Sequence, residues 1–326
     1  MPQSLPSLAV CLSLLLATAA ALGQESAASK STSERGGNAS PDPRDLQDRL
    51  ADLLIADVIA AIRSHDSISA RLRQKIDVLG QQLVGTGQYL QQGRGEQQKI
   101  RLELKIQVSD QTTSMQQVCD GTFLWLHQDL LDKTTLTRID VRRVREAVFD
   151  RGGRRSRFEQ IQLALGGLPK LIEALDKAFE FRIVQQDRLD GVPVWVVRGT
   201  WRPEQLAATY PDPKSKKGEG QGEVRPVGKL PPHAPEVMVM LIGRDDLFPY
   251  RIEFRRRLAT DDKTPERTDA TVPLVVMEWF EVALDTPIDE RQFIYRPGDL
   301  RPVDGTDKLL VKMGLREEEK SDKARK

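Results

Sequence analysis

Few side chains in this sequence have the types and spacings that catalyse reactions. The three histidines, His65, His127 and His233, lie far apart, and none stands in the His-Glu-x-x-His spacing that binds zinc. Cys119 precedes Asp120 and could act as a nucleophile, although a thiol within a strand is more often a small apolar residue. Neither a Gly-x-Ser-x-Gly elbow nor a Gly-Lys-Ser/Thr phosphate loop occurs. These patterns favour a protein that binds a ligand without a catalytic residue.

The charged residues narrow the classes of partner. Lys and Arg together number 49 and Asp and Glu 48, so the net charge of +1 gives no reason to expect a nucleic-acid partner. Asp and Glu are numerous, so a pair of catalytic carboxylates for hydrolysis is not excluded, but no spacing in the sequence identifies such a pair. We therefore expect no catalytic residue, no metal and no cofactor. An enzyme that acts on an envelope polymer is the least favoured hypothesis, after the two binding functions given at the end of this subsection.

The amino terminus has the pattern of a cleavable signal peptide. An apolar run over residues 8–22 ends with small residues at the positions that a signal peptidase reads. We expect residues 1–23 to be removed, residues 24–43 to form a flexible spacer, and the mature protein to be periplasmic. Cys119 is then the only cysteine of the mature chain, so no intramolecular disulfide can form.

Residues 272–284 carry the pattern on which the fold prediction depends. Side chains of a strand alternate between two faces, and here both alternating sets are apolar. A strand that is apolar on both faces is either enclosed in a core or wrapped around an interior that holds an apolar ligand. The first set is Leu274, Val276, Phe280, Val282 and Leu284, and the second is Val275, Met277, Trp279 and Ala283.

The remaining apolar periodicities predict a single domain over residues 44–312. An amphipathic helix is expected over residues 45–63, and residues 68–78 fit a strand better than a helix. A succession of strands follows, including two hairpins that each turn at an Asp-Gly pair, Asp120-Gly121 and Asp190-Gly191.

Three further segments interrupt or follow these strands. A helical spacing with a Gly-Gly interruption predicts an insertion at about residues 141–178. Residues rich in Pro, Gly, Lys and Glu predict a mobile loop at about 203–235. Residues 313–326 are expected to form a charged tail.

Four short segments occur in an order that is typical of one family. They are Cys119-Asp120-Gly121 with Leu124-Trp125-Leu126, Asp190-Gly191-Val192-Pro193-Val194-Trp195, Phe248-Pro249-Tyr250-Arg251-Ile252, and Thr286-Pro287-Ile288-Asp289 with Phe293. In this order and with a signal peptide, the chain after Ser67 resembles the LolA-like family of periplasmic lipoprotein carriers. The resemblance implies an α+β fold, a strongly curved antiparallel half-barrel sheet with helices packed in its open side. The loop over residues 211–235 and the Arg-rich insertion depart from the family's pattern.

The resemblance also implies an apolar cavity for acyl chains inside the half-barrel. Burying a methylene contributes about 0.8 kcal/mol, so such a cavity can hold a lipid without covalent chemistry. The same side chains would otherwise form an ordinary core. The candidate lining residues are Leu102, Leu104, Ile106, Trp125, Trp195, Phe254, Trp279 and Phe280.

The helical insertion is rich in arginine. Such a segment is either a solvated helix face or a contact surface for anionic lipid head groups or an acidic partner. The sequence therefore leaves a peripheral contact with a membrane surface as one of the two alternatives. The residues concerned are Arg142, Arg143, Arg145, Arg154, Arg155 and Arg157.

The sequence thus predicts an exported, non-catalytic monomer that shelters a lipid or lipoprotein acyl chain and acts as a periplasmic carrier. The alternative is an envelope regulatory or structural module that binds a protein partner through the same fold, with an interior filled by its own side chains. A copurifying lipid would favour the carrier. A stable protein partner without lipid would favour the module.

Overall fold

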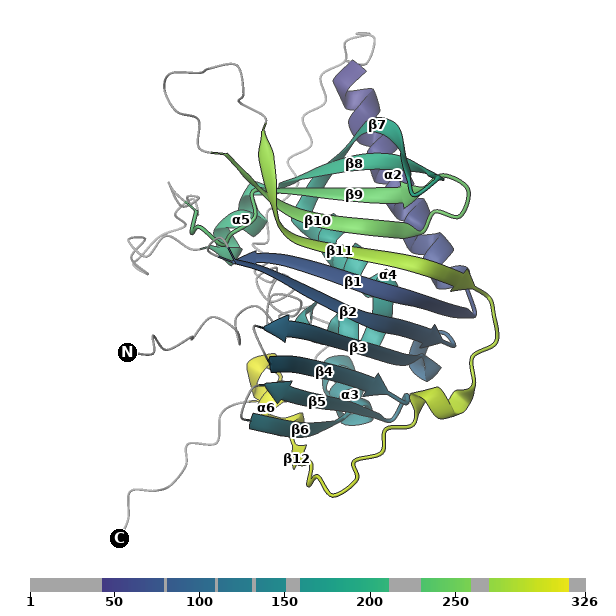
Figure 1. Cartoon of the computed structure of the whole chain (residues 1–326), viewed down its shortest axis with the longest axis vertical. Coiled ribbons are helices and arrows are strands. Elements are labelled where there is room, and N and C mark those ends of the chain that lie inside the picture. The colour runs from purple at the N-terminus through teal and green to yellow at the C-terminus, as the bar shows by residue number, and fades with distance from the viewer. Residues whose placement is uncertain are drawn as a thin grey trace.

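Twelve strands form one sheet in the computed structural model, which describes residues 43–78, 81–108, 111–130, 133–150, 159–210, 230–258 and 270–316. The sheet order is β12-β6-β5-β4-β3-β2-β1-β11-β10-β9-β8-β7 (Figure 1). Neighbouring strands are antiparallel except β12 and β6, which pair in parallel. The strands are β1 (Ser67–Val78), β2 (Gln81–Gln92), β3 (Lys99–Val108), β4 (Gln111–Cys119), β5 (Phe123–Leu130), β6 (Lys133–Asp140), β7 (Phe179–Leu189), β8 (Val192–Trp201), β9 (Val237–Gly243), β10 (Pro249–Arg257), β11 (Thr271–Leu284) and β12 (Val303–Asp304).

The described α-helices are α2 (Pro43–Ser64), α3 (Val141–Asp150), α4 (Glu159–Ala178), α5 (Pro203–Thr209) and α6 (Thr306–Lys312). The helix predicted over residues 45–63 is α2, and the segment predicted as a strand in preference to a helix is β1. The predicted signal peptide and nearly all of the predicted spacer lie outside the described residues.

Two segments differ from their prediction. Residues 203–209, predicted as part of a mobile loop, form α5, because Pro203 is compatible with the first turn of a helix and Ala207 is buried. The packed part of the chain also extends beyond residue 312. Met313 is 1% exposed and Leu315 packs against the core, so the predicted charged tail begins too early. Residues 211–229 and 317–326 lie outside the described residues.

The sheet curves around α2 and α4 and remains open, which confirms the predicted α+β half-barrel (Figure 1). We call the face toward these helices the inner face and the opposite face the outer face. Alternate residues of β3 from Ile100 to Ile106 are buried on the inner face, because period-two alternation places one apolar set against the helices. The helices contribute Ala51, Ile55, Val58 and Ile62 of α2 and Leu168, Leu171, Ile172 and Leu175 of α4.

The alternation in β11 shifts by one residue at Glu281. Trp279 pairs with Leu72 and Leu284 pairs with Ile68, and residues that pair directly across antiparallel strands share a face. Leu72 and Ile68 are both buried in the inner core, so Trp279 and Leu284 lie on the same face. In a regular strand they would lie on opposite faces, because they are five residues apart. A bulge at Glu281, where φ is 49°, accommodates the extra residue. The prediction that Trp279 and Leu284 lie on opposite faces is therefore wrong.

A C-terminal strap, residues 285–305, runs from the end of β11 past the ends of β3 to β6 and reaches the edge of the sheet (Figure 1). It begins with the 3-10 helix η3 (Glu290–Phe293), in which Phe293 is 1% exposed. The guanidinium of Arg101 on β3 donates a hydrogen bond to the carbonyl oxygen of Gln292 at 2.7 Å. The strap ends as β12, which pairs with β6 and becomes the edge strand of this end of the sheet.

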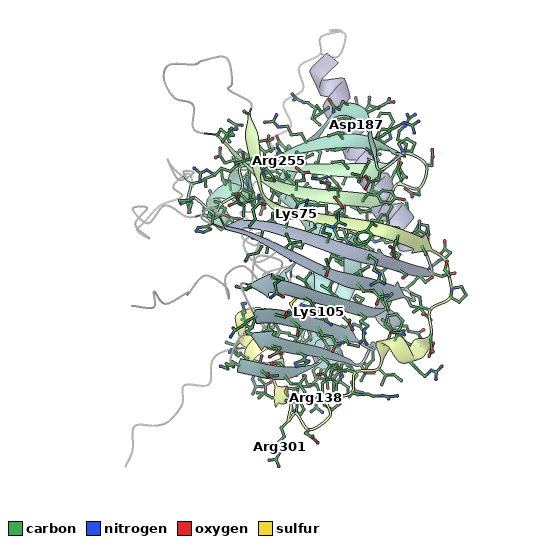
Figure 2. The ribbon with its side chains drawn as sticks, viewed as in Figure 1. Lys75, Lys105, Arg138, Asp187, Arg255 and Arg301 are labelled. Carbon is green, nitrogen blue, oxygen red and sulfur yellow. The ribbon has the colours of Figure 1, made fainter. Side chains whose placement is uncertain are left out.

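Charged side chains occupy much of the remaining outer face (Figure 2). Glu278 of β11 lies 3.3 Å from the guanidinium of Arg73 and 3.4 Å from that of Arg251. Glu253 is 6% exposed and lies 2.7 Å from Arg251. The arginines in this row therefore have carboxylate partners within the protein.

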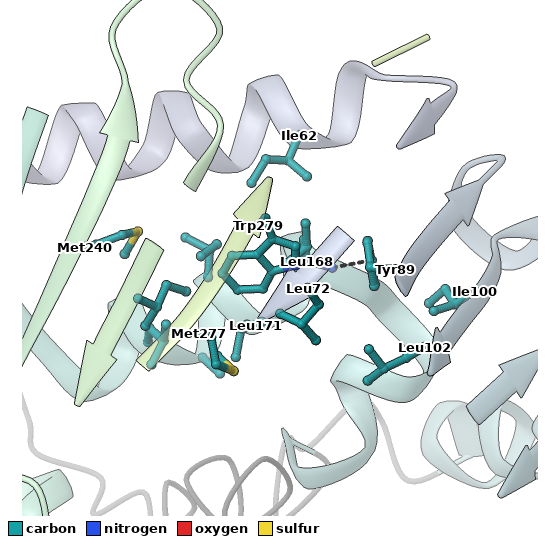
Figure 3. Packing of buried hydrophobic residues seen from close by; sticks show 14 of the residues in the cluster. Ile62, Leu72, Tyr89, Ile100, Leu102, Leu168, Leu171, Met240, Met277 and Trp279 are labelled. Atoms are coloured by element: carbon teal, nitrogen blue, oxygen red, sulfur yellow. Dashed lines mark hydrogen bonds between the residues drawn. The ribbon is translucent and has the colours of Figure 1, made fainter. Parts of the chain in front are cut away.

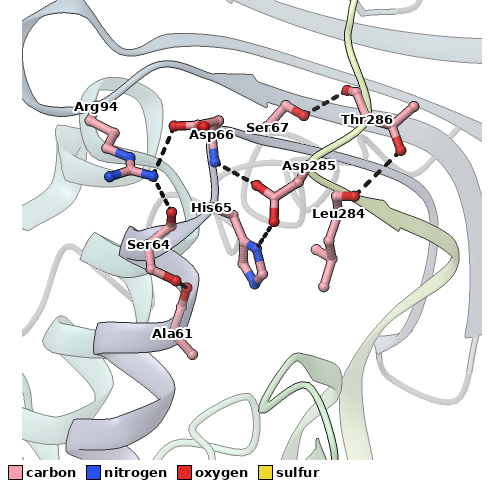
Figure 4. Close-up of polar contacts among 9 residues, drawn as sticks. All are labelled: Ala61, Ser64, His65, Asp66, Ser67, Arg94, Leu284, Asp285 and Thr286. Carbon is pink, nitrogen blue, oxygen red and sulfur yellow. Dashed lines mark hydrogen bonds and ion pairs between the residues drawn. The ribbon is translucent and has the colours of Figure 1, made fainter.

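Hydrogen bonds tie the end of α2 to the end of β11 (Figure 4). The carboxylate of Asp285 accepts a hydrogen bond from the backbone N–H of Asp66 at 2.7 Å and lies 2.7 Å from Nδ1 of His65. Ser67 Oγ donates to the carbonyl oxygen of Thr286 at 2.6 Å. The hydrogen bonds from His65 and Asp66 lower the pKa of the Asp285 carboxyl group. The helix is thereby fixed to the strand that joins the two halves of the sheet.

Candidate functional site

The predicted cavity residues lie in four different environments. Leu102 and Trp279 line a small cavity between the sheet and α4. Leu104, Ile106 and Phe254 are buried in the inner core. Two others lie on the outer face, and Trp195 lines a groove at the other end of the sheet.

Trp125 and Phe280 lie on the outer face and cannot line the interior. Trp125 follows Leu124, which is buried on the inner face, and its ring stacks on Tyr295 of the strap at a centroid distance of 5.3 Å. The ring of Phe280 lies 5.2 Å from the guanidinium carbon of Arg73. Successive side chains of a regular strand point to opposite faces, so Trp279 and Phe280 could not both face the interior. Including both in the predicted cavity was wrong for this reason.

The interior beneath α4 is filled by the protein's own side chains (Figure 3). The remaining cavity has a volume of about 20 Å³. A single water molecule needs roughly 10–15 Å³ measured in this way, so no acyl chain fits here while α4 is in place. The lining residues are Leu72, Tyr89, Leu102, Leu168, Leu171, Met277 and Trp279.

A kink in α4 is anchored to the sheet above this cavity. Gly167 has φ 63° and ψ −159°, outside the helical region, and Pro169 follows. The hydroxyl of Tyr89 accepts a hydrogen bond from the backbone N–H of Leu168 at 3.0 Å (Figure 3). It donates one to Oε1 of Gln91 at 2.6 Å. Burial raises the pKa of the Tyr89 hydroxyl, so it stays protonated as a donor. The kink and its two buried partners hold the second half of α4 against the inner face.

A much larger space lies at the other end of the inner face, between α2 and the strands β7 and β8. This groove has a volume of about 640 Å³. Three of its apolar side chains are among the most exposed in the described chain, Leu53 at 62%, Val184 at 54% and Leu50 at 49%. The lining residues are Leu50, Leu53, Leu54, Asp57, Ile183, Val184, Gln185, Gln186 and Trp195.

The wide apolar stripe of α2 forms one wall of the groove. Ala51 and Ile55 are fully buried against the sheet, and Leu50 and Leu53 extend the stripe to one side of them. The stripe is therefore wider than the sheet can cover. The groove residues Leu50, Leu53 and Leu54 belong to the periodicity that predicts the helix, and this excess width is the sequence signal for the groove.

A bulge in β7 forms the opposite wall. The pairing of β7 with β8 shifts between Ile183 and Gln185, which leaves Val184 without a direct partner. Ile183 and Val184 both line the groove as a result. Trp195 of β8, one of the predicted cavity residues, also lines it and pairs with the fully buried Ile242 on the inner face. No sequence pattern reveals this bulge, so Ile183 and Val184 were not predicted as site residues.

The Arg-rich segment is only partly described. Arg143 lies 2.7 Å from the carboxylate of Asp307, and Arg145 donates to the carbonyl oxygen of Gly121 at 3.4 Å. Arg142 is exposed on α3. Arg154, Arg155 and Arg157 lie outside the described residues, so a contact of this segment with anionic head groups stays a prediction.

Catalytic and metal chemistry find little support in the described residues. Cys119 is fully buried, and burial raises the pKa of its thiol, which disfavours the nucleophilic thiolate. No group of three or more His, Cys, Asp or Glu side chains that could hold a metal ion occurs in the described part. None of the helices described here is both long and apolar enough to span a membrane.

Comparison with known proteins gives structural matches alone. No family model and no curated protein matches the sequence. A DUF1329 family protein from Desulfovibrio piger matches with a TM-score of 0.33 and 11% identity, over 78% of this chain and 98% of that one. A putative outer membrane lipoprotein-sorting protein domain from Vibrio parahaemolyticus gives 0.32 and 12%, over 76% and 97%. The lipoprotein LppX from Mycobacterium tuberculosis gives 0.35 and 11%, over 74% and 98%.

Matches at these identities carry no conclusion about function. The open, curved sheet with α2 and α4 on its inner face is by itself the α+β half-barrel that the sequence resemblance implies.

Proposed function

We propose that this chain is an exported, non-catalytic binding protein that shelters a lipid or lipoprotein acyl chain and acts as a periplasmic carrier. The observation that supports the proposal is the open groove between α2 and β7, which exposes Leu50, Leu53 and Val184. Large exposed apolar patches in soluble proteins generally mark binding surfaces, because leaving them in water is unfavourable. The acyl chain would lie along this groove rather than beneath α4.

The size of the groove suits an acyl chain. The 640 Å³ of the groove, measured in the same way as the small cavity, is many times the roughly 10–15 Å³ that one water molecule needs, so the groove has room for an extended chain of methylenes. Burying a methylene contributes about 0.8 kcal/mol, so ten of them supply about 8 kcal/mol before the entropic costs of association. This is enough for reversible binding without a covalent bond.

The kinked helix α4 offers a second compartment in the same proposal. Leu168 and Leu171 cover the small cavity, and the kink at Gly167 marks where the helix could pivot. Displacing this half of α4 would uncover Leu102, Met277 and Trp279 on the inner face. This surface would then offer a separate apolar site for longer or additional chains.

A matched pair of valine substitutions tests the groove. Val184 is 54% exposed in the groove and Val84 on β2 is 46% exposed away from it. Val184→Glu places a carboxylate against the acyl chain and should weaken binding of dodecanoate at least about tenfold, because an unpaired charge is costly next to apolar surface. Val84→Glu should leave the affinity unchanged. Calorimetric titration measures both affinities.

Native mass spectrometry of the purified protein supplies the second test. A copurifying lipid that is lost in Val184→Glu would support the carrier. A protein that carries no lipid, binds no added acyl ligand and yet holds a stable protein partner would contradict the proposal and favour the envelope interaction module. Because Trp195 lines the groove, its fluorescence, assigned by comparison with Trp195→Phe, should respond to ligand.

A further inference from the structure

We infer that the ligand of the groove carries an anionic head group, a carboxylate or a phosphate, and that Arg244 binds this group at one end of the groove. The inference rests on the proposed function and specifies the class of lipid. It follows from the polarity of the groove, from the position of Arg244 and from the absence of a carboxylate partner for this arginine among the described residues.

Along β7 the lining of the groove changes from apolar to polar. Ile183 packs against the inner core and Val184 follows it in the groove. Gln185 and Gln186 come next along the strand and are both exposed. A ligand with an apolar tail and a polar head matches this order when its tail lies toward Ile183 and its head toward Gln186.

Arg244 stands at the polar end. Its guanidinium carbon lies 5.1 Å from the centre of the Trp195 ring, and Nη1 donates a hydrogen bond to Oε1 of Gln186 at 2.9 Å. Both of these neighbours line the groove. The cation is therefore held at the rim of the groove by contacts that do not neutralise its charge.

The chain around Arg244 fixes its position. The backbone N–H of Arg244 donates to the carbonyl oxygen of Pro193 at 3.0 Å, which ties it to β8. The adjoining turn is closed by hydrogen bonds from Gly243 N–H to Phe248 and from Leu247 N–H to Gly243, at 2.9 and 3.1 Å. A guanidinium stacked on an aromatic ring keeps its remaining N–H groups free for a planar oxyanion.

The electrostatic situation of Arg244 differs from that of the arginines on the outer face. Arg73 and Arg251 each lie within 3.4 Å of Glu278, whereas no carboxylate of the described residues forms an ion pair with Arg244. The nearby Asp246 accepts instead from the hydroxyl of Tyr250 at 2.5 Å.

Three other carboxylates belong to the groove or to the chain close to Arg244. Asp187 accepts from the backbone of Arg188, Asp245 follows Arg244 in the chain and is exposed, and Asp57 lines the groove on the α2 side. None of them is paired with Arg244 in the described structure, so its charge remains available to a ligand.

Ligands that share one chain and differ in the head group test the inference. Binding of dodecanoate, dodecyl phosphate and 1-dodecanol to the full chain is measured by calorimetry at pH 8, below the concentrations at which they form micelles. The wild type should bind both anionic ligands about tenfold or more tightly than the alcohol, the effect expected of a hydrogen bond to a charged group. Arg244→Gln should abolish this preference and leave the affinity for 1-dodecanol unchanged.

The matched control is Arg257→Gln, which removes the same charge from an exposed residue of β10 and should retain the preference. Equal affinities of the wild type for the three ligands, or an equal loss of all three in Arg244→Gln, would overturn the head-group inference and leave the acyl groove intact. Failure to bind any of the three would overturn the proposed function as well. Inorganic phosphate alone should not bind; affinity equal to that of dodecyl phosphate would show a site for free anions and overturn the inference.

Discussion

The two ends of the inner face differ in how completely a helix covers them. Beneath α4 the space between helix and sheet is about 20 Å³, whereas between α2 and β7 it is about 640 Å³. Both walls of both spaces are built largely from apolar side chains. The difference shows that an apolar strand face becomes a core or a binding surface according to the width and position of the helix above it.

The largest expected effect is on the free energy of unfolding, which should respond differently to alanine substitutions beneath α4 and in the groove. Ile172 of α4 is fully buried, so Ile172→Ala should lower the free energy of unfolding by about 2–5 kcal/mol through lost burial and a new cavity. Leu53→Ala in the groove should change it by less than about 0.5 kcal/mol, because Leu53 is 62% exposed. Urea unfolding measures both values. Equal losses would mean that the groove closes in solution.

The next effect concerns the kink of α4. Gly167→Ala should destabilise the protein by about 1–3 kcal/mol, since φ there is 63° and the new Cβ would lie 2.2 Å from Oε1 of Gln91. Gly191→Ala is a control for the backbone term alone, because its φ is 88° and no atom lies within 4 Å of the added Cβ. The difference between the two variants in thermal unfolding gives the steric contribution at Gly167, apart from the cost of a positive φ. A smaller loss in Gly167→Ala than in Gly191→Ala would contradict the proposed anchoring.

Tyr89→Phe tests the polar anchor of the same kink. Removing the hydroxyl leaves the buried N–H of Leu168 and Oε1 of Gln91 without this partner, which should cost about 1–3 kcal/mol of stability. If α4 opens for ligand, hydrogen exchange of the Leu168 amide should also become faster in the variant. Unchanged exchange would show that the hydroxyl does not hold the helix.

The smallest effect lies at the junction of α2 and β11, beyond both spaces. The pKa of Asp285 is lowered by its hydrogen bonds to His65 and Asp66, so its ionised form is favoured in the folded state. Its stabilising contribution is present above the unfolded pKa of about 3.9 and is lost as the pH falls through the lower folded value. Asp285→Asn should therefore reduce the melting temperature at pH 6 and make little difference at pH 2. A variant that is equally affected at both pH values would exclude this carboxylate as the cause.

The regular parts of this fold could be predicted from the sequence. The alternation in β3 and the two Asp-Gly turns identified strands and hairpins correctly, because period-two patterns and turns with positive φ are local properties. Asp190 and Gly191 have φ of 49° and 88°, as such a turn requires. The resemblance then supplied the curvature of the sheet, which no local pattern contains.

The candidate site was predictable only in part. Alternation tells which residues share a face but not which face the helices cover, so Trp125 was assigned to the interior although the strap covers it. The bulges at Glu281 and Val184 reverse the alternation without a local signal. The groove also joins Leu53 to Val184, residues that are distant in sequence and meet only through the packing of α2 on β7.

The pairing of β1 with β11 has a consequence for how this chain is made. The hydrogen bond between Asp66 and Asp285 joins residues that are 219 positions apart, and this seam connects the group β1 to β6 with the group β7 to β11. During synthesis each group can form its hairpins as it emerges, but they can merge only after residue 284 is available. Contacts between residues so far apart in the chain slow folding, and until the seam forms, β1 presents a free sheet edge. The late arrival of β11 therefore sets a period in which the unfinished protein is most exposed to aggregation.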